Sequence, residues 1–344
     1  MLTERAGIRI AEVSTWLVDN VDGAIAPFTF ELIAGGLSNL TFKVTGADGA
    51  RFVLRRPPLA AALASAHDMG REYRIISALQ HSDVPVAPAL GLCVDTAVND
   101  APFYVMAFVD GVPIKTVEEA TRLLTLEQRA VASESLVATL ASIHAVDIEA
   151  VGLSTLGRHD GYIARQLKRW QGQVHAQSAS DHTAIDELHD ELARRIPEQQ
   201  SVSIVHGDYR LDNCLVGPDG HVTAVLDWEI CTLGDPMADL GLLMVYWTGP
   251  DDEALAWSNA GTTAAGFMNR RQIAARYGEL TGRDISQLDY FEAFAYWKLA
   301  CILDGVYSRS IAGALGGQQI DNAPFLTRIE QALVTSKSLL QRLS

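Results

Sequence analysis

The stretch Ile204-Val-His-Gly-Asp-Tyr-Arg-Leu-Asp-Asn-Cys-Leu-Val216 decides the fold, together with Val222-Thr-Ala-Val-Leu-Asp-Trp-Glu229. In both segments apolar residues surround a few functional groups, and a Gly-Pro-Asp-Gly turn separates the segments. A hairpin-like fold would therefore bring Asp208, Asn213 and Asp227 together. These residues offer hard oxygen ligands of the kind that Mg²⁺ prefers, and a carboxylate that can act as a base.

The spacing of these three residues is typical of phosphoryl transfer. This chemistry needs a carboxylate beside the acceptor hydroxyl and metal ligands that hold a divalent ion on the phosphate oxygens. Asp208 suits the first role, Asn213 follows five residues later, and Asp227 lies fourteen residues beyond Asn213. The same spacing occurs in the protein-kinase pattern H-x-D-x-x-x-x-N followed by an Asp-led turn. The sequence therefore predicts a kinase-type catalytic centre.

Three motifs together resemble the aminoglycoside phosphotransferase and choline kinase family: His206–Asn213, Leu226–Glu229 and Gly234–Leu240. With Tyr162–Gln173 included, the chain looks most like the kinase-like domains that occur alone in bacteria or fused to acyl-CoA dehydrogenases. The resemblance covers most of the chain. It implies an α+β, protein-kinase-like fold with two lobes, a small β-rich N-terminal lobe and a larger, mostly α-helical C-terminal lobe.

The resemblance also implies roles for individual residues. ATP would lie in the cleft between the lobes, with Asp208 as catalytic base and Asn213 and Asp227 on magnesium. Asp239 is expected to brace the catalytic loop. Arg210, two residues after the base, would stabilise charge that develops on the transferred group, although an ordinary surface arginine is the alternative.

The N-terminal half has a β-like pattern. Strands are expected near Phe28–Ile33, Leu40–Thr45 and Arg51–Arg56, a helix near Asp68–Gln80, and further strands near Ala89–Asp95 and Pro102–Val109. Helical periodicity follows, as in Leu136, Leu140 and Ile143, broken by one β-rich stretch at Val202–Asp227. We therefore expect a nucleotide-binding lobe over residues 1–108, a hinge near 106–113, and a catalytic and acceptor-binding lobe over 109–344.

The nucleotide contacts are expected in the N-terminal lobe. The loop Gly35–Asn39 lies between two strands, where its N–H groups, Ser38 and Asn39 could cover the ATP phosphates. A plain hairpin turn is the alternative. Arg55 occupies the position at which the third strand of a kinase usually has a lysine, and Glu72 is its expected helix partner. Arg56 could share or take over this role.

Met106-Ala-Phe-Val-Asp-Gly111 resembles the segment that joins the two kinase lobes. Met106, Ala107 and Val109 are therefore expected to contact adenine, the latter two through backbone groups. The alternative is an ordinary edge strand. His206 precedes the base as in kinase loops, and we expect it to hydrogen-bond the loop backbone rather than to transfer a proton.

The composition excludes several classes of protein. The formal charge of −15, with 27 Lys and Arg against 42 Asp and Glu, argues against nucleic-acid binding. The four cysteines are far apart, and the longest apolar run, Leu240–Trp247, is far too short to span a bilayer. The N-terminus lacks an apolar signal core. We therefore expect a cytoplasmic protein without membrane contact, while the oligomeric state stays open.

The acceptor is the least determined part. Arg165, Lys168 and Arg169 have helical spacing and could contact an acidic acceptor, such as a hydroxy acid or a hydroxyacyl-CoA. An aminoglycoside is the alternative, because a cationic amino sugar could be bound by a group of acidic residues: Asp181, Asp186, Glu187, Asp190 and Glu191. Two further alternatives are a metal-dependent hydrolase and a nucleotide-binding pseudokinase without turnover, the latter suggested by arginine at position 55.

Overall fold

The computed structural model describes residues 7–35, 39–59, 68–177, 181–249, 260–313 and 323–343. The chain forms two compact units. The first unit contains Met1–Asp110 and Thr223–Glu229, and the second contains Gly111–Val222 and Ile230–Ser344. A short segment from the middle of the chain therefore belongs with the N-terminal unit.

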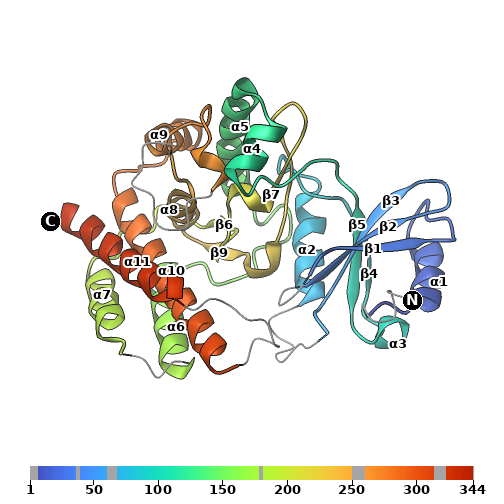
Figure 1. Cartoon of the computed structure of the whole chain (residues 1–344), viewed down its shortest axis with the longest axis horizontal. Helices are drawn as coiled ribbons and strands as arrows, with labels where there is room; N and C mark the ends of the chain where they lie inside the picture. The colour runs from blue at the N-terminus through green and yellow to red at the C-terminus, as the bar shows by residue number, and fades with distance from the viewer. Residues whose placement is uncertain are drawn as a thin grey trace. The chain divides into compact units, whose positions relative to one another are not determined.

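The first unit is built on a five-stranded antiparallel sheet with the strand order β1-β2-β3-β5-β4 (Figure 1). Its strands are β1 (Thr29–Ala34), β2 (Leu40–Thr45), β3 (Arg51–Arg56), β4 (Ala89–Cys93) and β5 (Phe103–Ala107). The helices are α1 (Ile10–Asn20), α2 (Met69–Leu79) and α3 (Thr96–Asn99). The predicted second and third strands agree with β2 and β3 residue for residue, and the predicted helix differs from α2 only by including the capping residues Asp68 and Gln80.

The alternation of side chains along β3 separates a core from a polar site. Phe52 and Leu54 share one hydrophobic core with Val13 and Leu17 of α1. Arg55 points to the opposite face, as the two-residue period of a strand requires, and forms an ion pair there with a residue of α2. The helix α1 was not predicted, because Val13 and Leu17 are its only buried residues.

The second unit is mainly helical. Its helices are α4 (Val117–Leu123), α5 (Leu126–Ala145), α6 (Tyr162–Gln177), α7 (Thr183–Arg194), α8 (Met237–Tyr246), α9 (Arg270–Thr281), α10 (Leu288–Ile311) and α11 (Ala323–Arg342). The short strands β6 (Ser203–Val205) and β9 (Thr232–Gly234) pair antiparallel. β7 (Cys214–Val216) and β8 (Val222–Val225) follow the loop that contains Asp208, and β8 leads the chain back into the first unit.

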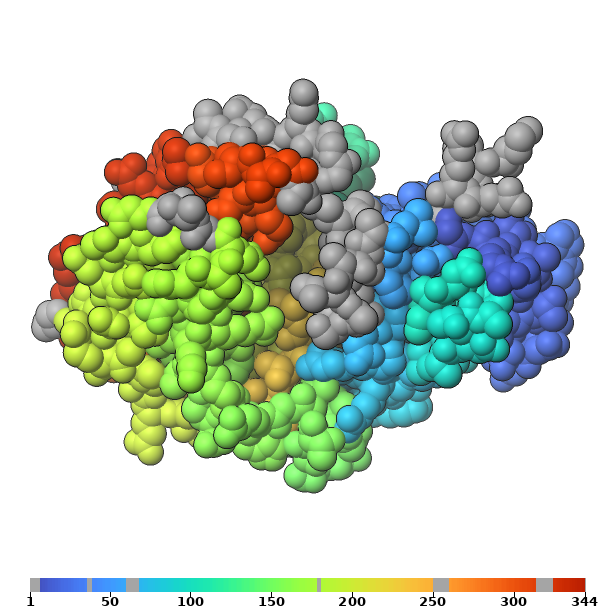
Figure 2. Space-filling model, turned by 90° about the horizontal axis from the view of Figure 1, so that it is seen from below, coloured from blue at the N-terminus to red at the C-terminus, as the bar shows by residue number. Residues whose placement is uncertain are grey.

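The helix α10 is the central element of this unit. It contacts α6, α7, α8 and α11, and its residues from Tyr290 to Cys301 are all buried. In Figure 2 the yellow-green surface of α6 and α7 adjoins the orange-to-red surface of the C-terminal helices. A Cβ at Gly241 would lie 2.5 Å from the carbonyl carbon of Phe291, so α8 and α10 approach each other at a position where only glycine fits.

A small antiparallel-sheet unit and a larger helical unit make the predicted α+β, protein-kinase-like class. No helix in the described part of the chain combines the length and the apolar character needed to cross a membrane.

Candidate active site

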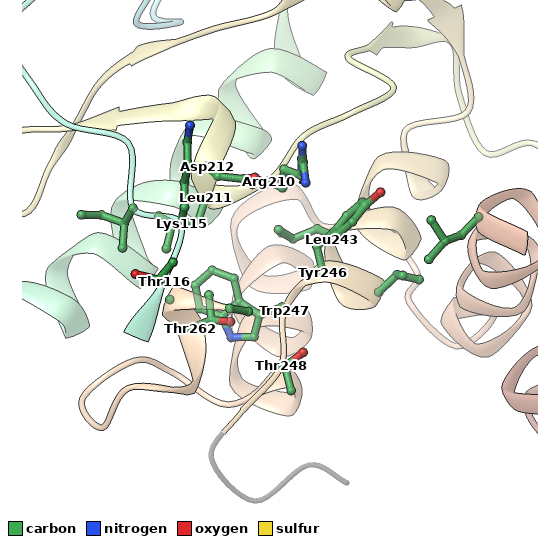
Figure 3. A pocket seen from close by; sticks show the side chains of 15 residues that line it. Lys115, Thr116, Arg210, Leu211, Asp212, Leu243, Tyr246, Trp247, Thr248 and Thr262 are labelled. Atoms are coloured by element: carbon green, nitrogen blue, oxygen red, sulfur yellow. Dashed lines mark ion pairs between the residues drawn. The ribbon is translucent and has the colours of Figure 1, made fainter. Parts of the chain in front are cut away.

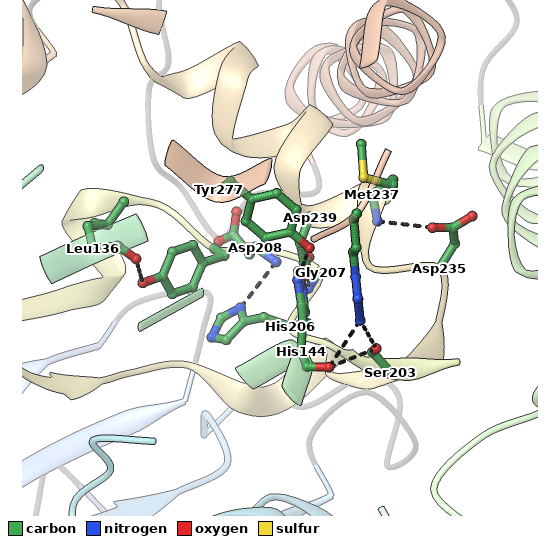
Figure 4. Close-up of polar contacts among 12 residues, drawn as sticks. Leu136, His144, Ser203, His206, Gly207, Asp208, Asp235, Met237, Asp239 and Tyr277 are labelled. Carbon is green, nitrogen blue, oxygen red and sulfur yellow. Dashed lines mark hydrogen bonds and ion pairs between the residues drawn. The ribbon is translucent and has the colours of Figure 1, made fainter. Parts of the chain in front are cut away.

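The loop between β6 and β7 is fixed by a buried carboxylate (Figure 4). The N–H groups of His206 and Gly207 donate to the two carboxylate oxygens of Asp239, at 2.7 and 2.8 Å. Nε2 of His144 lies 3.2 Å from the same side chain, which is fully buried at the start of α8. Asp239 therefore braces the loop as predicted.

The charge on this brace is maintained by its surroundings. Burial alone would raise the pKa of Asp239, but the hydrogen bond with His144 and the N–H of Gly207 hold it below the ordinary value. Burial lowers the pKa of His144, whose Nδ1 lies 2.7 Å from the hydroxyl of Tyr277. Gly207 has a φ of +85°, a conformation that favours glycine. The loop backbone is thus held from several sides.

Asp208 lies on this loop with its side chain 28% exposed. Nδ2 of Asn213 donates both to the main-chain oxygen of Asp208, at 2.8 Å, and to its Oδ2, at 2.7 Å. The side-chain oxygen of Asn213 is thereby directed away from Asp208. The N–H of Asp208 donates to Nδ1 of His206 at 3.2 Å, so His206 bonds the loop backbone as predicted.

Arg210 connects the loop with α8. Its Nε lies 3.4 Å from Oδ1 of Asp208, and its Nη1 lies 3.0 Å from Oδ2 of Asp212. The guanidinium stacks on the ring of Tyr246, 4.8 Å from the ring centroid (Figure 3). Arg210 is therefore a positioned side chain beside Asp208 and not a free surface arginine.

In the first unit, Arg55 pairs with three carboxylates. Its Nε lies 3.2 Å from Oε1 of Glu72, and its Nη2 lies 2.6 Å from Oδ1 of Asp227 and 4.0 Å from Oε2 of Glu229. The pairing of Arg55 with Glu72 is confirmed. Burial works against the charged guanidinium, but Glu72, Tyr104 and Asp227 outweigh it and raise the pKa of Arg55. In Glu72, burial has the opposite direction of effect: it raises the pKa, and the charge of Arg55 opposes this rise.

Arg56 does not share the role of Arg55, contrary to the alternative considered from the sequence. It is 5% exposed, and its guanidinium donates to the carbonyl oxygens of Gly7, Pro57 and Asn99. Neighbouring residues of a strand point to opposite faces of the sheet, so Arg56 lies on the side of α1 and α3.

The predicted loop residues are only partly described. Ser38 lies outside the described residues. Asn39 is 3% exposed, and its Nδ2 donates to Oε2 of Glu229 at 3.3 Å, while its buried Oδ1 has no partner among the described residues. Asn39 therefore contacts the segment that carries Asp227.

The expected adenine contacts lie at the end of β5. Met106 pairs with Val53 in the sheet and is buried. The N–H of Ala107 donates to the carbonyl oxygen of Pro88 at 2.8 Å, which removes it as a donor to adenine. The carbonyl group of Ala107 and the N–H of Val109 remain as candidates.

The oxygen donors of Asn213 and Asp227 are of the kind that binds a magnesium ion held partly by phosphates, rather than a metal ion held by protein side chains alone. The described residues contain no group of three or more His, Cys, Asp or Glu side chains placed to hold a metal ion. Asn213 and Asp227 offer an amide oxygen and a carboxylate, and Mg²⁺ commonly binds through one or two carboxylates while phosphates and waters complete its shell. The residue types at these two positions are therefore ones that Mg²⁺ accepts.

Two pockets of the second unit share Arg210 and Tyr246. One pocket, of about 300 Å³, includes Lys115, Asp212 and Trp247 (Figure 3). The other, of about 260 Å³, includes Asp208 itself. Because it contains the expected base, we call this second space the Asp208 pocket.

The Asp208 pocket contains two residues that sequence reasoning missed. Trp170 comes from α6 and Lys298 from α10. The sequence signal that could have identified Lys298 is its place as a single lysine in the apolar run Phe294-Ala-Tyr-Trp-Lys-Leu-Ala-Cys-Ile302. Of the basic residues predicted on α6, Arg169 lines this pocket, whereas none of the acidic residues proposed for an amino sugar does.

A family model described as the phosphotransferase enzyme family matches residues 29–272. Mouse acyl-CoA dehydrogenase family member 10 is 34% identical over 81% of this chain and 26% of that protein. Human acyl-CoA dehydrogenase family member 11 is 30% identical over 84% of this chain and 37% of that protein. The chain thus spans about a quarter to somewhat more than a third of the length of these relatives.

Solved structures share the fold. A chain from Ralstonia eutropha JMP134, assigned as an aminoglycoside phosphotransferase, superposes with a TM-score of 0.81 and 31% identity, covering 96% of this chain and 98% of its own length. A spectinomycin phosphotransferase, solved with ADP and spectinomycin, has a TM-score of 0.61, and covers 97% of this chain and 99% of its own length. Its 14% identity makes this second likeness one of fold alone.

Proposed function

Because the chain belongs to the phosphotransferase enzyme family, we propose that it is an ATP- and magnesium-dependent kinase that phosphorylates a hydroxyl group of a small molecule. The observation that carries this proposal is the catalytic loop. Asp208 is partly exposed at a pocket, Asn213 holds its carboxylate, and Asp239 holds the loop backbone.

In the proposed reaction, Asp208 accepts the proton of the acceptor hydroxyl while the hydroxyl oxygen bonds to the γ-phosphorus. The bond between this phosphorus and the β–γ bridging oxygen breaks, and ADP leaves. Arg210, beside Asp208, stabilises negative charge that develops on the transferred group. Arg55 binds phosphate oxygens of the nucleotide. Asn213 and Asp227 would hold Mg²⁺, which when bound neutralises charge on the phosphates.

For the acceptor we propose a hydroxy acid or a hydroxyacyl-CoA. Two observations support this class. The relatives are acyl-CoA dehydrogenase family members, and the Asp208 pocket includes the basic residues Arg169 and Lys298. An aminoglycoside is less favoured, because Asp208 is the only acidic residue among the described residues that line that pocket.

A pseudokinase without turnover is the second candidate. The observation that favours it is the contact between Arg55 and Asp227, which places a cation on a carboxylate that Mg²⁺ needs. In an active kinase, the ion pair between Arg55 and Asp227 would have to break when Mg²⁺ and ATP bind.

The test is ATP consumption with Mg²⁺ over hydroxy acids, hydroxyacyl-CoAs, aminoglycosides and choline-like alcohols. Asp208→Asn should lower kcat by about 10²- to 10⁴-fold, the usual contribution of a general base. Asp219→Asn, the same change at an exposed position of the following turn, should leave kcat unchanged. Undiminished turnover by Asp208→Asn would refute the mechanism. Stabilisation by ATP and Mg²⁺ without any turnover would establish the pseudokinase.

A further inference from the structure

The Asp208 pocket contains a buried cation that the proposed reaction does not use. Lys298 is 8% exposed and lines the pocket from α10. Its Nζ donates to the carbonyl oxygen of Gly207, the residue before the catalytic base, at 3.2 Å. The same Nζ lies 5.7 Å from the ring centroid of Trp170.

These contacts do not satisfy the ammonium group. An ammonium has three N–H donors, and the carbonyl of Gly207 accepts one. No carboxylate of the described residues lies within ion-pair distance of Nζ. A buried charge without a close partner is costly, and a ligand oxygen that accepts from the ammonium group would offset this cost. Lys298 thus has donors to offer a bound molecule.

The rest of the pocket indicates the charge of that molecule. Arg169 lies over the ring of Trp170, 5.6 Å from its centroid, and Arg210 contributes a second guanidinium. Among the described residues that line the pocket, three basic side chains therefore accompany one carboxylate, that of Asp208. Leu242, Leu299 and Ile302 add apolar surface, which suits a short carbon chain.

We propose that Lys298 is a specificity-determining residue, whose ammonium binds an acyl oxygen of the acceptor near the hydroxyl that Asp208 deprotonates. The acyl oxygen belongs either to a carboxylate or to a thioester carbonyl. Lys298 also disfavours acceptors with an amino group at this place, because two cations would meet in a buried site. The inference rests on the proposed kinase function and adds the residue that selects the acceptor.

The experiment compares matched acceptors with wild-type protein and Lys298→Met. The acceptors are 3- and 4-hydroxypentanoate, their CoA thioesters, and the corresponding pentanediols, which lack the acyl oxygen. Lys298→Met should raise KM for the acyl acceptors by about 10- to 100-fold, the range for a hydrogen bond to a charged group. KM for the diols should rise by a much smaller factor, so the readout is the ratio of the two KM changes, because loss of the bond to Gly207 affects both kinds of acceptor alike.

The free acids and the thioesters distinguish the two sources of the acyl oxygen, since the true acceptor class shows the larger KM effect. Lys337→Met, the same change at an exposed lysine of α11, is the matched control and should alter none of these values. If Lys298→Met does not fold, Lys298→Gln replaces it, because glutamine keeps an N–H donor for Gly207 without the charge.

Loss of activity by the same factor for acyl and diol acceptors would show that Lys298 only supports the loop, and would overturn the inference while leaving the kinase function intact. If the wild type phosphorylates no acceptor, the proposed function fails first. Calorimetric binding of the same acids and thioesters then decides the inference: weaker binding to Lys298→Met supports it, and equal or absent binding overturns it.

Discussion

At the scale of single residues, the proposed nucleotide-binding part depends on one half-buried arginine. Arg55 stands where kinases usually have lysine, and the planar guanidinium lets it contact Glu72 through Nε and Asp227 through Nη2 at the same time. A lysine offers a single charged nitrogen and would have to reach both carboxylates from that one atom. The departure from the usual residue therefore joins α2 to the segment that carries the expected metal ligand.

Replacing Arg55 by methionine should lower the free energy of unfolding by about 3–5 kcal/mol, because it leaves the buried Glu72 carboxylate without its partner. Urea denaturation measures this change. The double variant Arg55→Met/Glu72→Gln should recover a large part of the loss. Arg51→Met, on the same strand but in an exposed pair with Asp110, should have a much smaller effect. Equal losses at the two positions would contradict the prediction.

Asp235 should make stability depend on pH. It is buried, accepts a hydrogen bond from the N–H of Met237 at 3.0 Å, and burial raises its pKa to about 6. A carboxyl group with a raised folded-state pKa contributes stability below its unfolded pKa, and this contribution is lost as the pH rises through about 6.

Between pH 5 and pH 7.5, the wild type should therefore lose about 1 kcal/mol more of its unfolding free energy than Asp235→Asn does. Denaturation curves of both proteins at the two pH values provide the measurement. Parallel pH profiles for the two proteins would show that the carboxyl group is already ionised at pH 5.

At the scale of elements, α8 and α10 are the pair on which the second unit depends. Both helices line the Asp208 pocket, and α8 also carries Asp239. Their approach depends on Gly241, where even a methyl group would meet the backbone of Phe291. The packing of α8 against α10 therefore also determines the positions of the side chains that line the Asp208 pocket. The contact at Gly241, which sets this packing, involves no charged group.

Gly241→Ala should lower the free energy of unfolding by about 1–3 kcal/mol, the usual cost of overpacking. It should also raise KM for the acceptor more than KM for ATP, since it displaces α10 and with it Lys298. The control is Gly172→Ala, in the middle of α6, where no atom lies within 4 Å of the added methyl group. That variant should gain about 0.5–1 kcal/mol. A neutral Gly241→Ala would mean that the two helices can move apart freely.

Sequence reasoning succeeded where a local pattern determines the structure. The alternation in Arg51–Arg56 determines strand β3, and the spacing from His206 to Asn213 determines which loop groups meet. The sequence did not show that Arg56 lacks the role of Arg55, because the motif position alone does not tell which of these two neighbours faces the polar side of strand β3. Lys298 was missed because its role comes from packing between α6, α10 and the loop, a contact between residues far apart in sequence.

At the scale of the whole molecule, each unit contains part of the proposed machinery. Arg55, Asn39 and Asp227 belong to the first unit, and Asp208 and Asn213 to the second. A ligand that binds only the folded chain stabilises it by mass action. The nucleotide should therefore act on the stability of the protein even in the absence of an acceptor.

A non-hydrolysable ATP analogue with Mg²⁺, at one hundred times its dissociation constant, should add about 2.7 kcal/mol to the unfolding free energy. Chelation of Mg²⁺ should remove most of this gain, and Asp227→Asn should make the gain independent of Mg²⁺. Thermal unfolding with and without EDTA measures both effects. A gain that is insensitive to EDTA in the wild type would exclude the proposed magnesium ligands.

The segment Thr223–Glu229 belongs to the first unit, yet the ribosome makes it long after Asp110. The N–H of Val225 donates to the carbonyl oxygen of Pro85, and Asp227 pairs with Arg55, so the nascent N-terminal part lacks these partners while residues 111–222 are translated. The N-terminal unit therefore cannot finish folding when only residues 1–110 have been translated. We expect chains stalled on the ribosome to show a protected N-terminal unit only when residue 229 has left the exit tunnel.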